Sequence, residues 1–344
     1  LAARSAGQCS SRYGKIEDMV LGLRAVSGAG EPIRTDVERG RDLTPLLLGS
    51  EGTLAVIVDA RLRVQAAPEE RILRGYRFGD ITAGCEGMRR VMQLGLRPAV
   101  MRLYDPIDTL LASSGDHGQG AFARLGAWAS PGLRRRATSW AADHAASIGR
   151  ALHATFGRTR GCLLIAGFEG ACERAHLEAR IGHDTLLASG ATDLGPEPGQ
   201  RWFANRYKVS YQQSRVFAAG AFVDTMEVAT TWGRLPELYD SVRRAIAERA
   251  FVMAHMSHAY PEGCSIYFTF IASLEGGERL YDGIWDAALA ASMRSHGALS
   301  HHHGIGLLKT PWMAKEHGDA LRLLRAAKSA FDPAGIMNPG KLFS

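Results

Sequence analysis

From Pro68 onward, short apolar stretches alternate along the chain with longer stretches of helical periodicity. The strand-length stretches are residues 99–104, 161–168, 221–228, 251–258 and 264–272. Apolar residues recur at helical spacing over residues 83–95, 133–156, 170–189, 234–249, 277–296 and 313–331. Strands and helices mixed in this order predict an α+β fold in which helices flank a sheet.

Composition limits the classes of function. A chain of 344 residues, 46% of them apolar, can bury one large core or two ordinary ones. The net charge of +6 permits anionic ligands such as phosphate esters, but the basic residues are spread along the chain, so we predict no nucleic-acid binding. The five cysteines lie far apart without a C-x-x-C pair, which indicates a reducing compartment and argues against structural zinc. No apolar stretch reaches the roughly eighteen residues of a membrane span.

Three loops stand out between these segments. Residues 49–57, GSEGTLAVI, place two glycines around a carboxylate before an apolar strand, so that backbone N–H groups could approach a ligand closely. On chemistry alone, an ordinary turn entering a strand explains this segment better. Residues 113–135 and 193–200 are rich in small residues, glycine or proline, and we expect surface loops there.

An internal run of histidines, His301-His302-His303, precedes Gly304-Ile305-Gly306. If the segment is extended, His301 and His303 face one pocket and His302 turns away from it. Three imidazoles from this run would then not converge on one metal ion, so we predict no metal site here.

Other polar residues fit either a structural or a functional role. Tyr267, in the alternating segment 264–270, fits a core aromatic residue, and a role in proton transfer would require neighbours that lower its pKa. Arg102 follows an apolar stretch and fits a surface salt bridge. A basic cluster, Arg201, Arg206, Lys208 and Arg215, lies among aromatic residues and could bind a phosphate dianion.

Three segments of the chain together resemble one family. GSEGTLAVI resembles the GSEGTLGVIT signature of the FAD-linked oxidases of vanillyl-alcohol oxidase type, with Ala55 where the family usually has glycine. ARSAGQCSSRYGKIED, from Ala3, resembles the A-T-R-x-x-G segment upstream of that signature, and FDPAGIMNPGKLF, from Phe331, resembles the C-terminal tail. The resemblance implies the C-terminal part of a two-domain FAD-linked oxidase fold. We expect part of the FAD-binding domain at 1–67, a cap domain with an antiparallel sheet at 68–310, and a helix and tail at 311–344 that return to the first domain.

The resemblance also implies the cofactor FAD and the residues that border it. These are Ala3, Arg4, Ser5, Ala6, Glu51, Gly52, Thr53, Leu54, Ala55, Val56 and Ile57. Asn338 and Lys341 could lie near the flavin. The family's PGGGTS-type loop does not occur in the sequence, so we expect a piece of a longer enzyme that by itself binds FAD weakly.

One branch of the family is favoured. SHHHGIG resembles the SHHHGVG of the alkylglycerone-phosphate synthases. That resemblance implies Tyr267 as general acid/base, a catalytic role for His301, His302 and His303, and no metal. It implies that the substrate is held by Arg102, Arg206, Gln213 and Arg215. Gln213 stands where the synthases usually have arginine, and Arg215 could compensate if strand spacing puts both on one face.

The implied reaction replaces the acyl group of acylglycerone phosphate with a fatty alcohol, in ether-lipid synthesis. An FAD-dependent 2-hydroxy-acid dehydrogenase or oxidase is the alternative, and a binding or dimerising remnant without catalysis is a third. We expect a lipid-phosphate substrate and a fatty alcohol as partners, a homodimer, and a cytoplasmic protein that contacts a membrane surface peripherally. The C-terminus KLFS is not an S-K-L peroxisomal signal.

Overall fold

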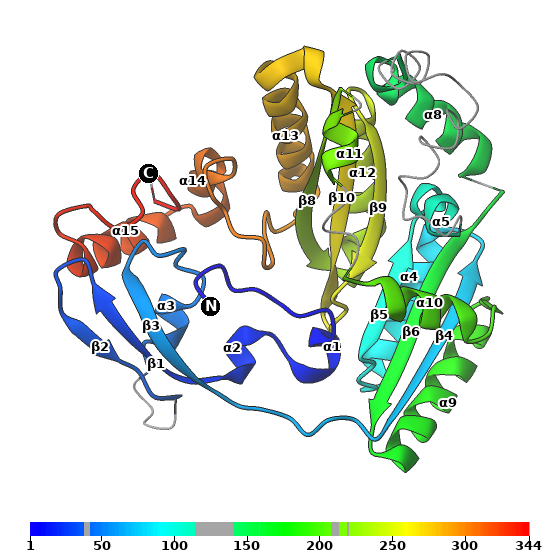
Figure 1. Cartoon of the computed structure of the whole chain (residues 1–344), viewed down its shortest axis with the longest axis horizontal. Coiled ribbons are helices and arrows are strands. Elements are labelled where there is room, and N and C mark those ends of the chain that lie inside the picture. The colour runs from blue at the N-terminus through cyan, green and yellow to red at the C-terminus, as the bar shows by residue number, and fades with distance from the viewer. Residues whose placement is uncertain (38–41, 114–139, 158, 208–212, 219, 344) are drawn as a thin grey trace. The chain divides into compact units, whose positions relative to one another are not determined.

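The computed structural model describes residues 1–37, 42–113, 140–157, 159–207, 213–218 and 220–343. They form two compact units, coloured along the chain in Figure 1. The first unit combines Leu1–Ala67 with Ala298–Ser344, and the second unit is Pro68–Gly297. Residues 298–310, which we expected in the cap domain, belong to the first unit.

The first unit is built on a small antiparallel sheet. Within the described residues its strand order is β2 (Pro32–Arg34), β1 (Val20–Ser27), β3 (Ala55–Leu62). Three short helices accompany it: α1 (Ser10–Tyr13), α2 (Ile16–Met19) and α3 (Thr44–Leu47). Alternation along β3 buries Ala55 and exposes Val56, and the apolar residues of β1, α3 and the start of β3 form one core cluster.

The C-terminal segment completes this unit. It contains η5 (Thr310–Trp312), α14 (Met313–His317) and α15 (Ala320–Phe331), and Phe331 and Phe343 pack against the core cluster of the sheet. We expected a single helix over 313–331, which is wrong. Gly318 has a φ of 51°, a left-handed conformation that favours glycine and ends α14.

The second unit has a larger sheet, whose strand order over the described residues is β7-β4-β6-β5-β9-β10-β8. The strands are β4 (Glu70–Phe78), β5 (Val100–Tyr104), β6 (Cys162–Gly170), β7 (Thr192–Asp193), β8 (Ala221–Thr231), β9 (Phe251–Ser257) and β10 (Gly263–Ser273). Each pairing is antiparallel, as expected for the cap sheet.

Helices flank this sheet, which confirms the α+β class. They are α4 (Ile81–Gln93), α5 (Pro106–Ser113), α8 (Ala145–Phe156), α9 (Cys172–Ala188), α10 (Glu197–Asn205), α11 (Gln213–Ala218), η3 (Trp232–Arg234), α12 (Leu235–Ala247), η4 (Leu274–Gly276) and α13 (Gly277–Arg294). The expected loop 193–200 is helical from Glu197. The expected loop 113–135, apart from Ser113, and the first residues of the expected helix 133–156 lie outside the described residues.

Alternate residues of β4 contact different helices on the two faces of the sheet. Tyr76 hydrogen-bonds His183 of α9, whereas the guanidinium of Arg71 lies 4.3 Å from the ring centroid of Phe203 in α10. Even and odd positions of a strand point to opposite faces, so α9 and α10 cover opposite faces of the sheet. In the part of the chain that the structure describes, no helix is both long and apolar enough to cross a bilayer.

Candidate active site

A row of directly paired residues crosses the second unit's sheet on the face that carries α10. The register pairs Arg77 with Leu163, Leu163 with Tyr104, Tyr104 with His255, His255 with Tyr267, and Tyr267 with Glu227. Directly paired residues of antiparallel strands point to the same face. Six strands therefore bring polar and aromatic side chains, widely separated in the sequence, into one line.

Tyr267 lies in this row between an imidazole and a carboxylate. Its ring stacks on His255, with centroids 4.8 Å apart and 17° between the planes, and His258 lies 5.9 Å away by the same measure. Glu227, its partner on β8, is fully buried. Neither His255 nor Glu227 was predicted from the sequence.

Two charged residues fix the ring of His255. Arg102 lies two residues before Tyr104 on β5, and its Nη2 donates to Nε2 of His255 over 2.7 Å. The other ring nitrogen, Nδ1, lies 3.1 Å from Oδ2 of Asp108. Because a guanidinium can only donate, Nε2 is the acceptor and Nδ1 carries the proton. Arg102 thus forms a half-buried hydrogen bond to histidine and not the surface salt bridge that its position in the sequence also fitted.

Asp105 holds the segment that carries Asp108. Its carboxylate accepts hydrogen bonds from the backbone N–H of Asp108 (2.7 Å), the hydroxyl of Tyr239 (3.1 Å) and the backbone N–H of Ala254 (3.0 Å). Burial, together with the nearby charge of Asp108, raises the pKa of Asp105 to about 7. This buried group links the start of α5 to β9 directly beside His255.

The environment of Tyr267 favours its neutral form. Burial raises the pKa of its hydroxyl, the charge of Glu227 raises it further, and Arg102 opposes both with a smaller effect. We expected neighbouring imidazoles or cations to lower this pKa, and within the second unit the net effect has the opposite sign. Tyr267 is therefore protonated at neutral pH, and its surroundings within the second unit oppose the release of this proton.

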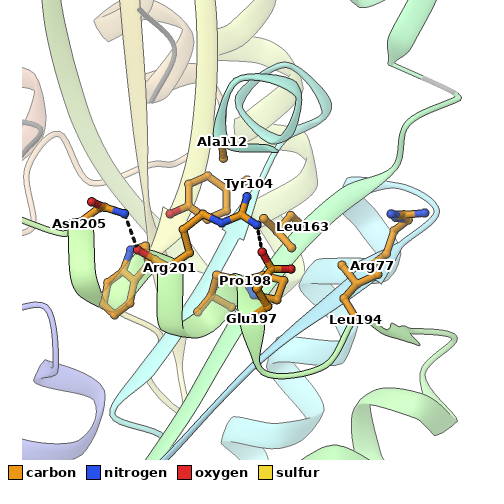
Figure 2. Close-up of a pocket in the computed structure, with 11 residues that line it drawn as sticks. Arg77, Tyr104, Ala112, Leu163, Leu194, Glu197, Pro198, Arg201 and Asn205 are labelled. Carbon is orange, nitrogen blue, oxygen red and sulfur yellow. Dashed lines mark hydrogen bonds and ion pairs between the residues drawn. The ribbon is translucent and has the colours of Figure 1, made fainter. Parts of the chain in front are cut away.

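A cavity of about 280 Å³ adjoins one end of the row. Figure 2 shows Arg77, Tyr104 and Leu163 on one side of it and α10 on the other. Arg201 of α10 lines this cavity and pairs with Glu197, and Trp202 adds an apolar surface. The cavity thus combines two guanidinium groups with apolar walls.

Three other predicted substrate residues are placed differently. Arg206, which follows α10, lies 3.6 Å from the ring centroid of Phe203 and donates to that residue's carbonyl, and it does not line the cavity. The backbone of Gln213 and Arg215 belongs to α11, so the strand spacing that would put both residues on one face is absent. Their side chains lie outside the described part of the chain.

In the first unit, Glu51 connects three segments that are distant in the sequence. Its Oε1 accepts the backbone N–H of Ile305 and its Oε2 that of Gly306 over 3.0 Å. Asn338 donates to the carbonyl of Glu51, whose own N–H donates to Ala2 over 2.8 Å. The carboxylate expected beside the cofactor therefore anchors the loop after the histidine run.

The histidine run is not extended, which corrects our expectation. Residues 301–303 form bends, and His301 and His302 hydrogen-bond each other through their Nδ1 atoms, 2.9 Å apart. His302 is buried, whereas His303 is exposed. The turn follows from Gly304, with a φ of 82°, and from the anchoring of the next two residues by Glu51. Adjacent residues His301 and His302, rather than His301 and His303, share a cavity.

That cavity of the first unit measures about 270 Å³ and fits part of a flavin. Four of the predicted cofactor residues line it, Ala3, Arg4, Glu51 and Leu54, together with His301 and His302. Gly49 leaves room there, because a Cβ at this position would lie 3.2 Å from Nε of Arg4. A guanidinium and imidazoles among apolar side chains suit a heterocycle with a polar edge and apolar faces.

The other predicted cofactor residues do not line this cavity. Thr53 is fully buried and its hydroxyl donates to the carbonyl of Ser50 over 2.6 Å. Ala55 is buried in the core cluster, and Ile57 packs against that cluster. The remaining four, Ser5, Ala6, Gly52 and Val56, lie outside the lining.

Comparison with known proteins identifies the family of the chain. Residues 67–342 match the family described as FAD linked oxidases, C-terminal domain. The chain belongs to this family. The cofactor of the FAD-linked oxidases is FAD, which agrees with the predicted cofactor.

Several relatives of this FAD-linked oxidase carry more specific names. Alkyldihydroxyacetonephosphate synthase of Trypanosoma brucei brucei is 28% identical over 99% of the chain and 55% of its own length. An uncharacterized FAD-linked oxidoreductase of Escherichia coli K12 is also 28% identical, over the whole chain and 67% of its own length. A solved alkyldihydroxyacetonephosphate synthase superposes with a TM-score of 0.70 at 25% identity, covering 98% of the chain and 56% of that protein. The chain thus spans about half the length of the synthases it matches.

Proposed function

We propose that the enzyme containing this chain exchanges the acyl group of acylglycerone phosphate for a fatty alcohol. One observation carries the proposal: the phenol ring of Tyr267 lies against His255, whose position is fixed by the cation Arg102 and by Asp108. The resemblance to alkyldihydroxyacetonephosphate synthases supports it.

The chain's own residues have distinct roles in this proposal. Bound FAD would supply the nucleophilic ring nitrogen at which the groups are exchanged. Tyr267 holds a proton at its hydroxyl and passes it to or from the substrate, while Arg102 attracts the substrate's anionic group. The fatty acid leaves, and the incoming alcohol releases its hydroxyl proton. The exchange therefore involves no net oxidation or reduction.

The cavity lined by Tyr104, Trp202 and Arg201 supports an amphiphilic substrate. It shares Tyr104 with the row that contains Tyr267, and its walls combine apolar side chains with guanidinium groups. A lipid phosphate has the same combination of charge and apolar chain. We extend the proposal to a homodimer that contacts a membrane surface peripherally and lies in the cytoplasm.

An FAD-dependent 2-hydroxy-acid dehydrogenase or oxidase is the second candidate. A guanidinium beside an imidazole would bind a carboxylate as readily as a phosphate. The Escherichia coli relative at the same 28% identity is named an FAD-linked oxidoreductase, which supports a redox reaction but names no substrate.

The two reactions differ in what happens to the flavin. The full-length, FAD-loaded enzyme should be incubated without oxygen, either with acylglycerone phosphate and a labelled fatty alcohol or with D-lactate or glycolate. Labelled ether lipid, with the visible absorbance of the oxidised flavin retained at the end of turnover, supports the synthase. Bleaching of that absorbance by a 2-hydroxy acid, without ether formation, supports the dehydrogenase. A full-length protein that holds no FAD would exclude both.

A further inference from the structure

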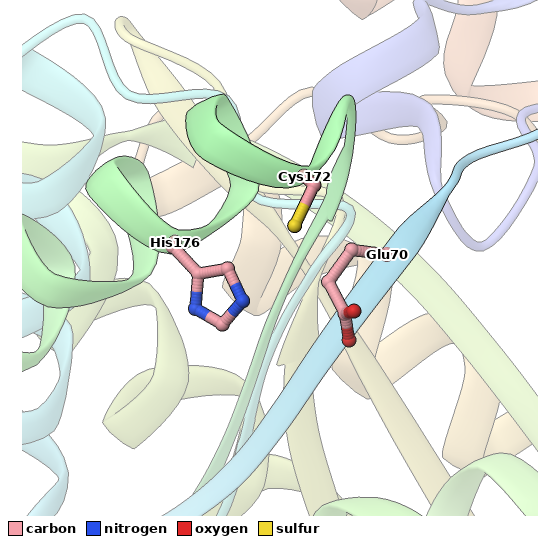
Figure 3. A group of neighbouring side chains, drawn as sticks. All are labelled: Glu70, Cys172 and His176. Carbon is pink, nitrogen blue, oxygen red and sulfur yellow. The ribbon is translucent and has the colours of Figure 1, made fainter.

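We propose that Glu70, Cys172 and His176 bind a divalent transition-metal ion of the Zn²⁺ class on the second unit. A carboxylate oxygen, the thiol sulfur and a ring nitrogen of these residues all lie within 4.8 Å of one another. Figure 3 shows the three side chains directed into one space between the start of β4 and the first turns of α9.

The distances are close to those of a filled site. Zinc–ligand bonds of about 2.0–2.3 Å in a tetrahedron put neighbouring ligand atoms roughly 3.3–3.8 Å apart. Ligand atoms within 4.8 Å therefore need to move by about 1 Å, which side-chain rotation supplies. Cys172 and His176 are exposed and Glu70 is half-buried, so the side chains have room to adjust.

Local structure explains why these residues meet. Cys172 and His176 are four residues apart in α9, a spacing that puts both on one helix face. Glu70 pairs with Gly170 across the β4–β6 ladder, two residues before Cys172. The carboxylate of Glu69 accepts the backbone N–H of Cys172 over 3.2 Å, which fixes the first turn of α9 beside β4.

Neighbouring charged side chains do not occupy the three proposed ligands. The adjacent charges Arg71 and Glu169 pair with each other. No described residue forms an ion pair with Glu70. All five cysteines lie in the described part of the chain, and Cys172 is the exposed one. Its thiol is therefore available to a metal ion from solution.

The donor set selects the class of metal. A thiolate and an imidazole favour Zn²⁺ and similar ions over Mg²⁺ or Ca²⁺, which prefer oxygen ligands. Three protein ligands leave a fourth tetrahedral position for water. A bound ion would join the start of α9 to β4.

Cobalt provides a direct test, because Co²⁺ bound by a thiolate gives a sulfur-to-metal charge-transfer absorption. The reduced full-length protein should be titrated with Co²⁺ and then with Zn²⁺. We expect the absorption to saturate at one Co²⁺ per chain, to disappear when Zn²⁺ is added, and to persist with excess Mg²⁺. Cys172→Ser should abolish the charge-transfer absorption. Glu70→Gln and His176→Ala should each weaken the affinity for Co²⁺ at least about tenfold, because each removes one ligand of the ion.

Two matched variants control the test. Glu173→Gln removes an exposed carboxylate next to Cys172, and Cys9→Ser removes another thiol. Both should bind Co²⁺ like the wild type. The proposal is overturned if the wild type shows no saturable absorption, or if the absorption survives Cys172→Ser. It is also overturned if Glu70→Gln and His176→Ala bind like the wild type, since the cysteine alone would then hold the ion.

Discussion

The imidazole of His255 lies parallel to the phenol ring of Tyr267, with ring centroids 4.8 Å apart and 17° between the planes. Asp108 and Arg102 each contact one nitrogen of that imidazole, so the orientation and the tautomer of the ring are fixed. Tyr267 therefore has a rigid neighbour on one side. Predictions about turnover follow from this arrangement.

Replacing Tyr267 with phenylalanine should separate catalysis from packing. In the FAD-loaded full-length enzyme, Tyr267→Phe should lower turnover about a hundredfold or more, because a general acid is lost. The free energy of unfolding should fall by only about 1 kcal/mol. Tyr281→Phe is the matched control, since it removes a hydroxyl bonded to Asp224 elsewhere in the second unit. Near-normal turnover of Tyr267→Phe would make this residue a core aromatic only.

Asp108 acts through His255 as a positioning residue. Asp108→Ala removes the acceptor of the Nδ1 proton of His255, so turnover should fall about ten- to a hundredfold. This factor corresponds to the free energy of one hydrogen bond to a charged group. The pH profile of kcat should also shift, and Asp108→Glu should restore part of both. Asp240→Ala, which removes an exposed carboxylate on α12, should change neither. An unchanged pH profile in Asp108→Ala would argue against positioning.

The histidine run should respond unequally to substitution. His301 and His302 line the first unit's cavity, whereas His303 is exposed. His301→Ala and His302→Ala should therefore each weaken FAD retention or turnover at least about tenfold. A tenfold change corresponds to the loss of an interaction worth roughly 1.5 kcal/mol. His303→Ala should have a smaller effect. The measurements are flavin absorbance per protein and turnover. Zinc and iron content, measured in a Cys172→Ser background, should show no metal at the run, and stoichiometric metal there would contradict the flavin-only mechanism.

Glu51 should matter for stability. Glu51→Gln keeps the shape but points an amide N–H toward a backbone N–H of Ile305 or Gly306, which leaves a donor without an acceptor. Such a loss costs about 1–3 kcal/mol, measured by denaturant unfolding. Glu31→Gln, at an exposed position of the same unit, should be neutral. Equal stability of the two variants would show that the anchor contributes nothing.

Asp105 should make stability depend on pH. Its folded pKa is raised to about 7, whereas the unfolded chain releases this proton near pH 4. The folded state therefore binds more protons between these values, and the unfolding free energy should fall as pH rises through this window, by at most about 4 kcal/mol. Asp105→Asn should remove this component, and Asp240→Asn should leave it. Identical pH dependence in wild type and Asp105→Asn would refute the raised pKa.

Hydrophobic periodicity predicted the central strands and most helices, but it missed β4. Residues 70–78, ERILRGYRF, interrupt the apolar pattern with arginines, two of which pair with Glu169 and Asp193 in the fold. Those partners are about a hundred residues away in the sequence. Charges that are neutralised only in the tertiary structure hide a strand from pattern analysis.

The candidate site was predictable only in part. Tyr267 and Arg102 were found through resemblance, whereas His255 in FVMAHMS has no local signal that distinguishes it from a structural histidine. Its role depends on the register that pairs it with Tyr267 and Tyr104. The bend at the histidine run depends on the positive φ of Gly304 and on the hydrogen bonds to the distant Glu51. Neither can be predicted from the amino-acid sequence around the histidines.

The hydrogen bonds from Ile305 and Gly306 to Glu51 join residues 254 and 255 positions apart. During synthesis, the second unit is a continuous segment that can fold as soon as residue 297 has left the ribosome. The first unit has to wait, because Phe331 and Phe343, which cover its core cluster, are made after the second unit. Its early strands therefore remain partly uncovered while some 230 residues are translated. Ribosome-bound chains of this protein should therefore expose residues 1–67 to chaperones while the second unit is translated.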